Sequence, residues 1–242
     1  MAETRIGVIG CGGRMGRMLI ADIVATEGCE LSGGVARSRS ASLGQDLGEL
    51  AGIGRLGLTA GEDVRQVGRP IVIGTTGLTG EQEKAIHGAA ERIPVVWAAN
   101  TSLGINLLFG LVEQVAARLG PEWDIEIMEM HHRGKVDAPS GTALALGRTA
   151  AAARGDAFEE VAQRGRDGIT GPRKSGAIGF AALRGGDNIG EHHVMFAGVG
   201  ERLELVHRAT NRAIYAKGAV RAARWLIGRP PGLYGMKEVL GL

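Results

Sequence analysis

A dense group of side chains capable of acid–base chemistry stands in the middle of the chain. His131, His132, Lys135 and Asp137 follow an apolar stretch and precede the turn Pro139-Ser140-Gly141. Imidazoles titrate near neutral pH and an ammonium group can supply a proton, so this combination suits proton transfer to a bound substrate. Each residue alone would also fit an ordinary turn between a strand and a helix. Their density is typical of an active site.

The flanking elements indicate how this group would be held. The stretch 123–131 alternates enough to predict a strand, and Ser140 can cap a helix over 142–153. Such a helix start would leave three backbone N–H groups facing the loop, those of Gly141, Thr142 and Ala143. N–H groups at a helix start attract anions, and Lys135 adds a positive charge. The segment therefore predicts a site for a carboxylate substrate.

The N-terminus has the pattern of a dinucleotide site. An apolar strand over 5–9 leads into the glycine turn Gly10-Cys-Gly-Gly-Arg-Met-Gly16 and a helix over 17–25. Glycines in such a turn let a pyrophosphate approach the backbone at the start of the helix. The spacing departs from the usual G-x-G-x-x-G, because Met15 occupies the place of the third glycine and Gly16 follows it.

The end of the next expected strand, 30–36, is basic rather than acidic. In a dinucleotide site an Asp or Glu at this place binds the free 2′-hydroxyl of the ribose. Here the strand ends in Ala36-Arg37-Ser38-Arg39. Two guanidinium groups and a hydroxyl suit a 2′-phosphate better, so Arg37 and Arg39 favour NADP(H).

The whole pattern predicts an α/β protein of two domains. A Rossmann-like dinucleotide-binding domain is expected over 1–101 and 213–242, and an α+β domain with an open mixed sheet, for substrate binding and oligomerisation, over 102–212. Helices are expected at 81–92, 103–119, 142–153 and 213–227. Further strands are expected at 71–73, 94–99, 123–131, 177–183, 193–197 and 203–207, the last three as antiparallel strands.

Composition limits the possible classes of protein. With 242 residues and 44% hydrophobic residues the chain can build a proper core, and a net charge of +2 is too small to indicate a nucleic-acid partner. Two cysteines predict no disulfide framework, and no apolar stretch is long enough to span a membrane. The N-terminus leaves no room for a signal peptide, so a cytoplasmic location is expected. The pair His192-His193 lacks ligands at metal spacing, and no metal site is expected.

These motifs, in this order, resemble the dihydrodipicolinate reductase family. The turns 10–16 and Gly74-Thr-Thr-Gly77 resemble the family's two cofactor turns, and Ala98-Ala-Asn100 resembles the stretch beside the nicotinamide. The segment from His131 to Thr142 resembles its substrate loop. The resemblance extends over nearly the whole chain, through 176–180, 190–193 and 200–204.

The resemblance implies reduction of 4-hydroxy-tetrahydrodipicolinate, a cyclic dicarboxylate, to tetrahydrodipicolinate with NADPH or NADH, in diaminopimelate and lysine biosynthesis. By position, it implies His131 as a general acid or base and Lys135 as the proton donor. The implied substrate-binding residues are His132, Ser140, Gly141 and Thr142. The implied cofactor-binding residues are Gly10, Cys11, Gly12, Gly13, Arg14, Met15, Arg37, Gly74, Thr75, Thr76, Ala98, Ala99, Asn100 and Thr101.

The expected sheet of the second domain also suggests an assembly. The runs Ile178-Phe180-Ala182, Val194-Phe196 and Leu203-Leu205 place apolar side chains on alternate positions. Helices would cover one face of this sheet, and a solvated second face would be more polar than these runs are. We therefore expect sheets to pack together between subunits, in the homotetramer that the family implies.

One part of the family's pattern is absent. The family has, before the Gly74 turn, an additional strand and helix of roughly two dozen residues, part of the usual dinucleotide-binding half. Here Asp63-Val-Arg-Gln-Val67 runs almost directly into the strand 71–73. Either the sheet closes up, with 71–73 beside the first strand, or part of the cofactor site is lost. The second case would suit a dicarboxylate-binding or regulatory protein of the same fold, whereas the intact His131 and Lys135 favour an active reductase.

Overall fold

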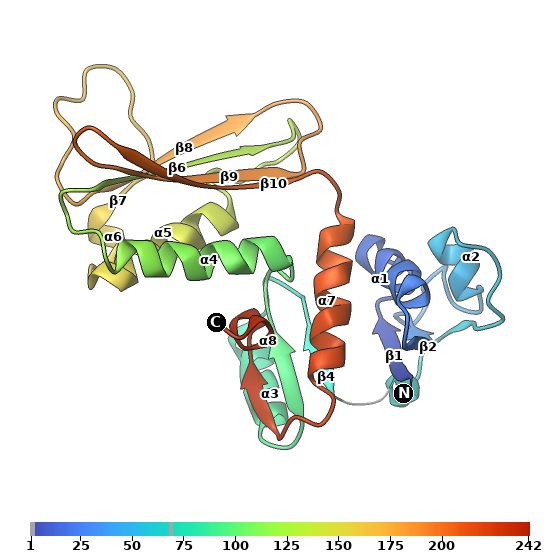
Figure 1. Ribbon diagram of the computed structural model, residues 1–242. Coiled ribbons are helices and arrows are strands. Elements are labelled where there is room, and N and C mark those ends of the chain that lie inside the picture. The colour runs from blue at the N-terminus through green and yellow to red at the C-terminus, as the bar shows by residue number, and fades with distance from the viewer. Residues whose placement is uncertain (1–2, 68–69) are drawn as a thin grey trace. The chain divides into compact units, whose positions relative to one another are not determined.

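The computed structural model describes residues 3–67 and 70–242. Gly68 and Arg69, where the sequence lacks the expected strand and helix, lie outside the described residues. The chain divides into two units, Met1–Leu103 with Ala213–Leu242, and Gly104–Arg212 (Figure 1). Among the described residues, the first unit has two three-stranded sheets and the second unit one five-stranded sheet, and the core of each unit is its own.

The first part of the nucleotide-type unit follows the strand, turn and helix pattern of its sequence. Strands β1, β2 and β3 form a parallel sheet in that order. Ile20 and Ile23 lie on one face of α1, three residues apart, and pack with Val8 and Leu31 of the sheet. The elements here are β1 (Thr4–Ile9), α1 (Arg14–Ala25), β2 (Cys29–Val35), α2 (Leu47–Ala51), β3 (Ala60–Gly61) and the 3₁₀ turn η1 (Val64–Val67).

The rest of this unit is a second parallel sheet in the order β11-β5-β4. Helix α7 contacts both α1 and β4, and its Val220 belongs to the core under α1. A capping box between Thr79 and Gln82 starts α3. The elements are β4 (Ile71–Ile73), α3 (Gly80–Ala90), β5 (Pro94–Trp97), α7 (Ala213–Trp225), β11 (Gly232–Tyr234) and α8 (Met236–Leu240).

The nucleotide-type sheet is therefore divided. Within the described residues, β1 pairs only with β2, and β4 pairs only with β5. Of the two alternatives, the one in which 71–73 lies beside the first strand is wrong. The helix layer explains this, because α1 covers β1 and α7 contacts β4. Packed helices lie about 8–10 Å apart, whereas paired strands lie about 4.8 Å apart. Because α1 and α7 pack side by side, β1 and β4 are held about two strand spacings apart, which is too far for them to pair.

The second unit is a mixed sheet in the order β10-β9-β6-β8-β7, with α4 and α5 on one side (Figure 1). Strands β9 and β10 are antiparallel as expected, whereas β8 runs parallel to β6. The connection from β6 to β8 contains α5, α6 and the edge strand β7, and a long crossover of this kind connects parallel strands. The elements are α4 (Leu103–Ala116), β6 (Asp124–His131), α5 (Gly141–Arg154), α6 (Phe158–Val161), β7 (Ala162–Gln163), β8 (Ile178–Arg184), β9 (Gly190–Ala197) and β10 (Arg202–Ala209).

The core of this unit lies between the sheet and its two helices. Ile127, Phe180, Val194 and Phe196 are buried there with residues of α4 and α5. The apolar runs that suggested an intersubunit face thus point at the helices, and that reasoning is wrong. The alternate side chains of the same strands form the open face. Its apolar members include Met128, Met130, Ala181, Leu183, Met195, Ala197 and Val206.

Candidate functional site

The substrate-type loop is anchored where β6 ends and α5 begins. Ser140 caps α5, since its Oγ accepts a hydrogen bond from the Ala143 N–H at 3.2 Å. The expectation that the Ala143 N–H faces the loop is therefore wrong, because the cap uses it. Within the described chain, the N–H groups of Gly141 and Thr142 donate to no other residue and keep the anion-binding character of a helix start.

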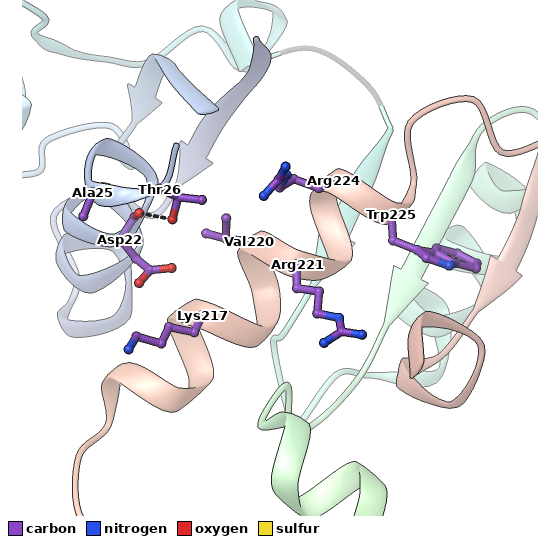
Figure 2. Close-up of a pocket in the computed structure, with 8 residues that line it drawn as sticks. All are labelled: Asp22, Ala25, Thr26, Lys217, Val220, Arg221, Arg224 and Trp225. Carbon is purple, nitrogen blue, oxygen red and sulfur yellow. Dashed lines mark hydrogen bonds between the residues drawn. The ribbon is translucent and has the colours of Figure 1, made fainter. Parts of the chain in front are cut away.

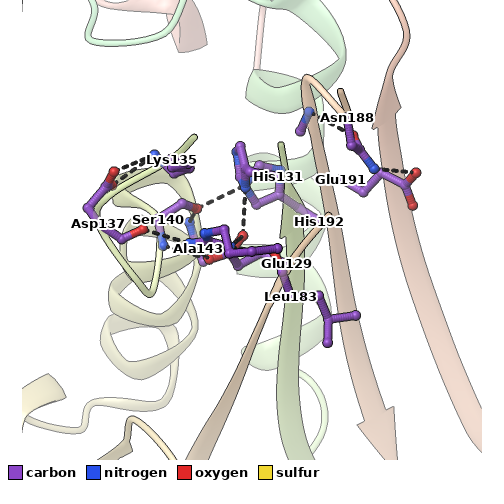
Figure 3. A network of polar contacts seen from close by, with 12 residues as sticks. Glu129, His131, Lys135, Asp137, Ser140, Ala143, Leu183, Asn188, Glu191 and His192 are labelled. Atoms are coloured by element: carbon purple, nitrogen blue, oxygen red, sulfur yellow. Dashed lines mark hydrogen bonds and ion pairs between the residues drawn. The ribbon is translucent and has the colours of Figure 1, made fainter. Parts of the chain in front are cut away.

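A buried carboxylate organises this region. Glu129, on the helix-facing side of β6, is 0% exposed. Its two oxygens receive the guanidinium of Arg184 at 2.7 and 2.8 Å. Figure 3 shows the carboxylate of Glu129 between His131 and Ser140. They also receive the backbone N–H of Ser140 at 3.1 Å and contact Nδ1 of His131 at 2.6 Å. Burial alone would raise the pKa of Glu129, but the hydrogen bonds from Arg184 and His131 hold that pKa below its usual value.

His131 is neutral in this setting. Burial lowers the pKa of the imidazole, and the opposing effect of Glu129 does not restore it. An ionised carboxylate can only accept, so Nδ1 of His131 carries the proton that is shared with Glu129. Nε2 then carries the lone pair and lies over Gly190, where a Cβ would stand 2.9 Å from it.

His192 completes the buried group from the neighbouring strand. It is 4% exposed, its Nε2 lies 3.1 Å from the Ser140 Oγ, and its ring is 5.3 Å from the ring of His131. Burial is the main cause that lowers the pKa of His192 to about 3. The adjacent His193 alternates to the other face and approaches Glu191 at 3.6 Å. In the described residues no three potential ligands lie close enough to hold a metal ion.

Lys135 and His132 lie in the loop itself. The Lys135 Nζ forms an ion pair with Asp137, at 2.7 and 2.9 Å from its two oxygens. The positive charge of Lys135 also acts on His131, whose pKa it lowers. The backbone N–H of His132 donates to the Asn188 carbonyl at 2.7 Å, which ties the loop to the start of β9. The structure thus brings the sequence-derived substrate residues together around one helix start.

Three residues of this group were not assigned a role from the sequence: Glu129, Arg184 and His192. A signal for Glu129 was present, since it stands two residues before His131 in an otherwise apolar strand face. A charge on a core-facing position requires a cationic partner. The partner, Arg184, pairs with His131 in the ladder between β6 and β8. That register was not readable from the sequence.

The first cofactor-type turn has the geometry that its glycines suggest. Gly10 has φ +80°, and Gly13 starts α1 without a side-chain cap. The backbone N–H groups of Gly10 and Cys11 donate to Val35, so the turn lies against the end of β2. The exposed Arg37 follows that strand end two residues later. An uncapped helix start beside an arginine fits the phosphates of a dinucleotide.

The second cofactor-type turn lies on the other small sheet. Gly74-Thr75-Thr76 follows β4 and Ala98-Ala99-Asn100 follows β5, and the Ala98 N–H donates to Ile73 at 3.0 Å. Both segments therefore stand at the carboxyl ends of adjacent parallel strands, where nucleotides bind in such sheets. Thr101 differs, because its buried hydroxyl donates to the Tyr215 carbonyl of α7 at 2.7 Å. The hydroxyl proton of Thr101 is therefore used in the contact with α7.

A separate pocket of about 790 Å³ lies between α1 and α7 (Figure 2). Three basic side chains of α7 line it, Lys217, Arg221 and Arg224, opposite Asp22 of α1. The α1 residues involved are in the last turns of that helix, whereas the glycine turn is at its start. The pocket is therefore not part of the cofactor turn. Within the described chain, no helix is long and apolar enough to cross a bilayer.

Comparison with family models gives a match over nearly the whole chain. The model "Dihydrodipicolinate reductase, C-terminus" matches residues 104–240. The model "Dihydrodipicolinate reductase, N-terminus" matches in two pieces, residues 4–68 and 62–101. The break between the two pieces falls where the sequence lacks the expected strand and helix.

Curated relatives and solved structures agree with this match. A 4-hydroxy-tetrahydrodipicolinate reductase from Alkalilimnicola ehrlichii is 49% identical over an alignment of 265 residues that covers 99% of each chain, and a Brucella abortus protein of the same name is 48% identical over 97% of this chain and 98% of its own. The first alignment is longer than this chain of 242 residues, as a missing segment requires. Dipicolinate-bound dihydrodipicolinate reductase from Paenisporosarcina sp. TG-14 has the same fold, with a TM-score of 0.76 and 23% identity over 98% of this chain and 100% of that one.

Proposed function

Because the chain belongs to the dihydrodipicolinate reductase family, we propose that it reduces 4-hydroxy-tetrahydrodipicolinate to tetrahydrodipicolinate with a reduced nicotinamide cofactor, in diaminopimelate and lysine biosynthesis. The observation that carries the proposal is the loop at the start of α5. There His131, Lys135 and the N–H groups of Gly141 and Thr142 stand on one segment, fixed by the buried Glu129. A dianionic ring needs cationic and N–H donors of this kind.

In the proposed reaction, the substrate loses its 4-hydroxyl group as water, and the ring then accepts a hydride and a proton. A reduced nicotinamide, when bound, supplies the hydride. Lys135 donates the proton to the carbon next to the one that receives the hydride. The N–H groups of Gly141 and Thr142, with His132, hold the carboxylates. Neutral His131 accepts a proton or hydrogen bond at Nε2, so the residue acts as a base rather than an acid.

Cofactor binding is assigned to three segments of the first unit: residues 10–15 with Arg37, residues 74–76, and residues 98–100. The uncapped start of α1 and the close packing of its glycines support the pyrophosphate position. Arg37 and Arg39 follow β2 and support a preference for NADPH over NADH. Thr101 and Ser140 have structural roles. The Thr101 hydroxyl binds α7, and the Ser140 side chain caps α5.

The proposal includes a homotetramer and a cytoplasmic location. The open face of the second unit's sheet carries Met128, Met195 and the 46% exposed Leu183, which suits contact with another copy. Cys11 and Cys29 are both free thiols, as is usual in a reducing compartment. The substrate is a small molecule, and neither nucleic acid nor a membrane is part of the proposed function.

The test is the oxidation of NADPH, followed by its absorbance, in the presence of freshly generated substrate. Oxidation that requires both the substrate and the protein is the expected result. If the protein binds dipicolinate in calorimetry but oxidises no cofactor, it is a dicarboxylate-binding protein of this fold rather than a reductase. In that case we would attribute the missing activity to the divided nucleotide-type sheet.

A further inference from the structure

We propose that Glu129, held by Arg184, is a positioning residue that fixes the tautomer of His131 and aligns it with the anion-binding start of α5. The inference rests on the proposed function for the part that His131 plays in catalysis. Its structural content does not depend on that function, because the tautomer of His131 can be measured without substrate.

The hydrogen bonds to Glu129 hold its carboxylate in one orientation. Oε1 receives Arg184 and the Ser140 N–H, and Oε2 receives Arg184 and His131. The bidentate guanidinium sets the plane of the carboxylate, and that plane sets where Nδ1 of His131 can bond. Since an ionised carboxylate has no proton to give, the hydrogen bond to His131 selects the tautomer protonated at Nδ1.

A purely structural reason for this acid is weak. Glu129 shares its strand face with Ile125 and Ile127, which are buried in the core, and an apolar side chain would fit the same face. Replacing a buried ion pair by apolar side chains is often neutral or stabilising. The role of the charge therefore lies in the groups that Glu129 binds, which are the imidazole of His131 and the backbone N–H of the helix cap Ser140.

The same carboxylate couples two parts of the site. The Ser140 N–H binds Glu129, the Ser140 Oγ caps α5, and His192 contacts that Oγ from β9. Arg184 extends the connection, since it also donates to the Asp137 carbonyl in the loop at 2.6 Å. The proton acceptor on β6 and the N–H groups that bind the substrate's carboxylates are thus held by one group.

The experiment compares Glu129→Gln with Glu126→Gln in the full-length protein. Glu126 is a matched control, because it lies on the same strand, on the opposite face, and binds the two arginines Arg166 and Arg173. Glu129→Gln keeps the shape and removes the charge. We expect its kcat to fall on the order of a hundredfold to ten-thousandfold, the range for losing the residue that orients a catalytic histidine. Its KM for NADPH should stay unchanged, and Glu126→Gln should change neither value.

Two readouts separate positioning from stability. The acid limb of the kcat profile should move to lower pH in Glu129→Gln, because the Glu129 charge opposes the burial that lowers the pKa of His131. Nitrogen NMR of wild-type His131 should show a single tautomer protonated at Nδ1, and Glu129→Gln should show a mixture. A wild-type His131 protonated at Nε2, or equal kinetics of the two variants, would overturn the proposal. If the wild-type protein oxidises no cofactor, the reductase function fails, and the NMR result still decides the positioning.

Discussion

Gly16 packs against the carbonyl oxygen of Gly10 so closely that a Cβ at residue 16 would lie 2.2 Å from that oxygen. The same Cβ would lie 2.7 Å from the Cα of Cys11. This contact brings the start of α1 against the end of β1, which is the task of the third glycine in a dinucleotide turn. The spacing of the turn puts Met15 at the usual place of this glycine, but Met15 is 39% exposed and Gly16, one residue later, makes the contact.

Gly16→Ala should therefore damage the cofactor turn. The added methyl group meets backbone atoms that cannot move without distorting the turn, so we expect a loss of stability on the order of 3 kcal/mol and weaker NADPH binding. Thermal unfolding and fluorescence titration with NADPH measure the two effects. The control is Gly88→Ala in α3, where a Cβ has open space and the change should stabilise the helix by up to about 1 kcal/mol. Unchanged NADPH affinity in Gly16→Ala would contradict this account of the turn.

Replacing both Arg37 and Arg39 by alanine should weaken NADPH selectively. Both side chains follow β2 at the edge where the glycine turn bonds to Val35, so they stand where the 2′-phosphate of NADPH is expected. A charge-assisted bond contributes about 1.5–3 kcal/mol, which corresponds to at least a tenfold loss of affinity. Fluorescence titration with each cofactor is the measurement. Equal losses for NADH and NADPH would show that the arginines do not read the 2′-phosphate.

Lys135→Ala should lower kcat by on the order of a hundredfold or more, the usual scale for a positioned proton donor. Cofactor affinity should stay near its original value, because Lys135 belongs to the substrate-type loop of the second unit. Lys174→Ala removes an exposed lysine of the same unit and should leave kcat unchanged. A rise of only the substrate's KM in Lys135→Ala would make the residue a carboxylate clamp, and the proton would then come from another group.

His192 should make the protein sensitive to acid. Its pKa is about 3 in the folded protein and 6.5 ordinarily, so the unfolded chain binds a proton at a pH where the folded one does not. The stability tied to His192 is therefore fully present above pH 6.5 and is lost as the pH falls from 6.5 toward 3. His192→Gln can keep a polar contact with Ser140 and cannot titrate. In urea unfolding at a series of pH values, its stability should fall less steeply over this range than that of the wild-type protein. Parallel slopes for the two proteins would refute the assignment.

The sequence was sufficient for elements with a strong local signal. The glycine turn, the helix that Ser140 caps and the strand ending at His131 are local patterns, and the structure has all three within a few residues of their expected bounds. The short elements α2, β3, α6, β7, β11 and α8 were missed, because two to five residues show no periodicity. The divided sheet and the Glu129–Arg184 pair depend on which strands become neighbours. Which strands become neighbours is determined by packing between residues far apart in the sequence, such as the contact of α7 with both α1 and β4.

The open face of the second unit's sheet should hold subunits together. Met128 lies in the central strand β6 and pairs with His193 of β9 and Ala181 of β8, so a charge at Met128 would stand in the middle of that face. Met128→Glu should therefore dissociate the proposed tetramer, while Ile169→Glu, at a fully exposed loop position, should not. Light scattering at micromolar concentration measures the mass. A wild-type mass near the 25.2 kDa of one chain would refute the assembly, and a stable dimer would mean that only one of its interfaces forms.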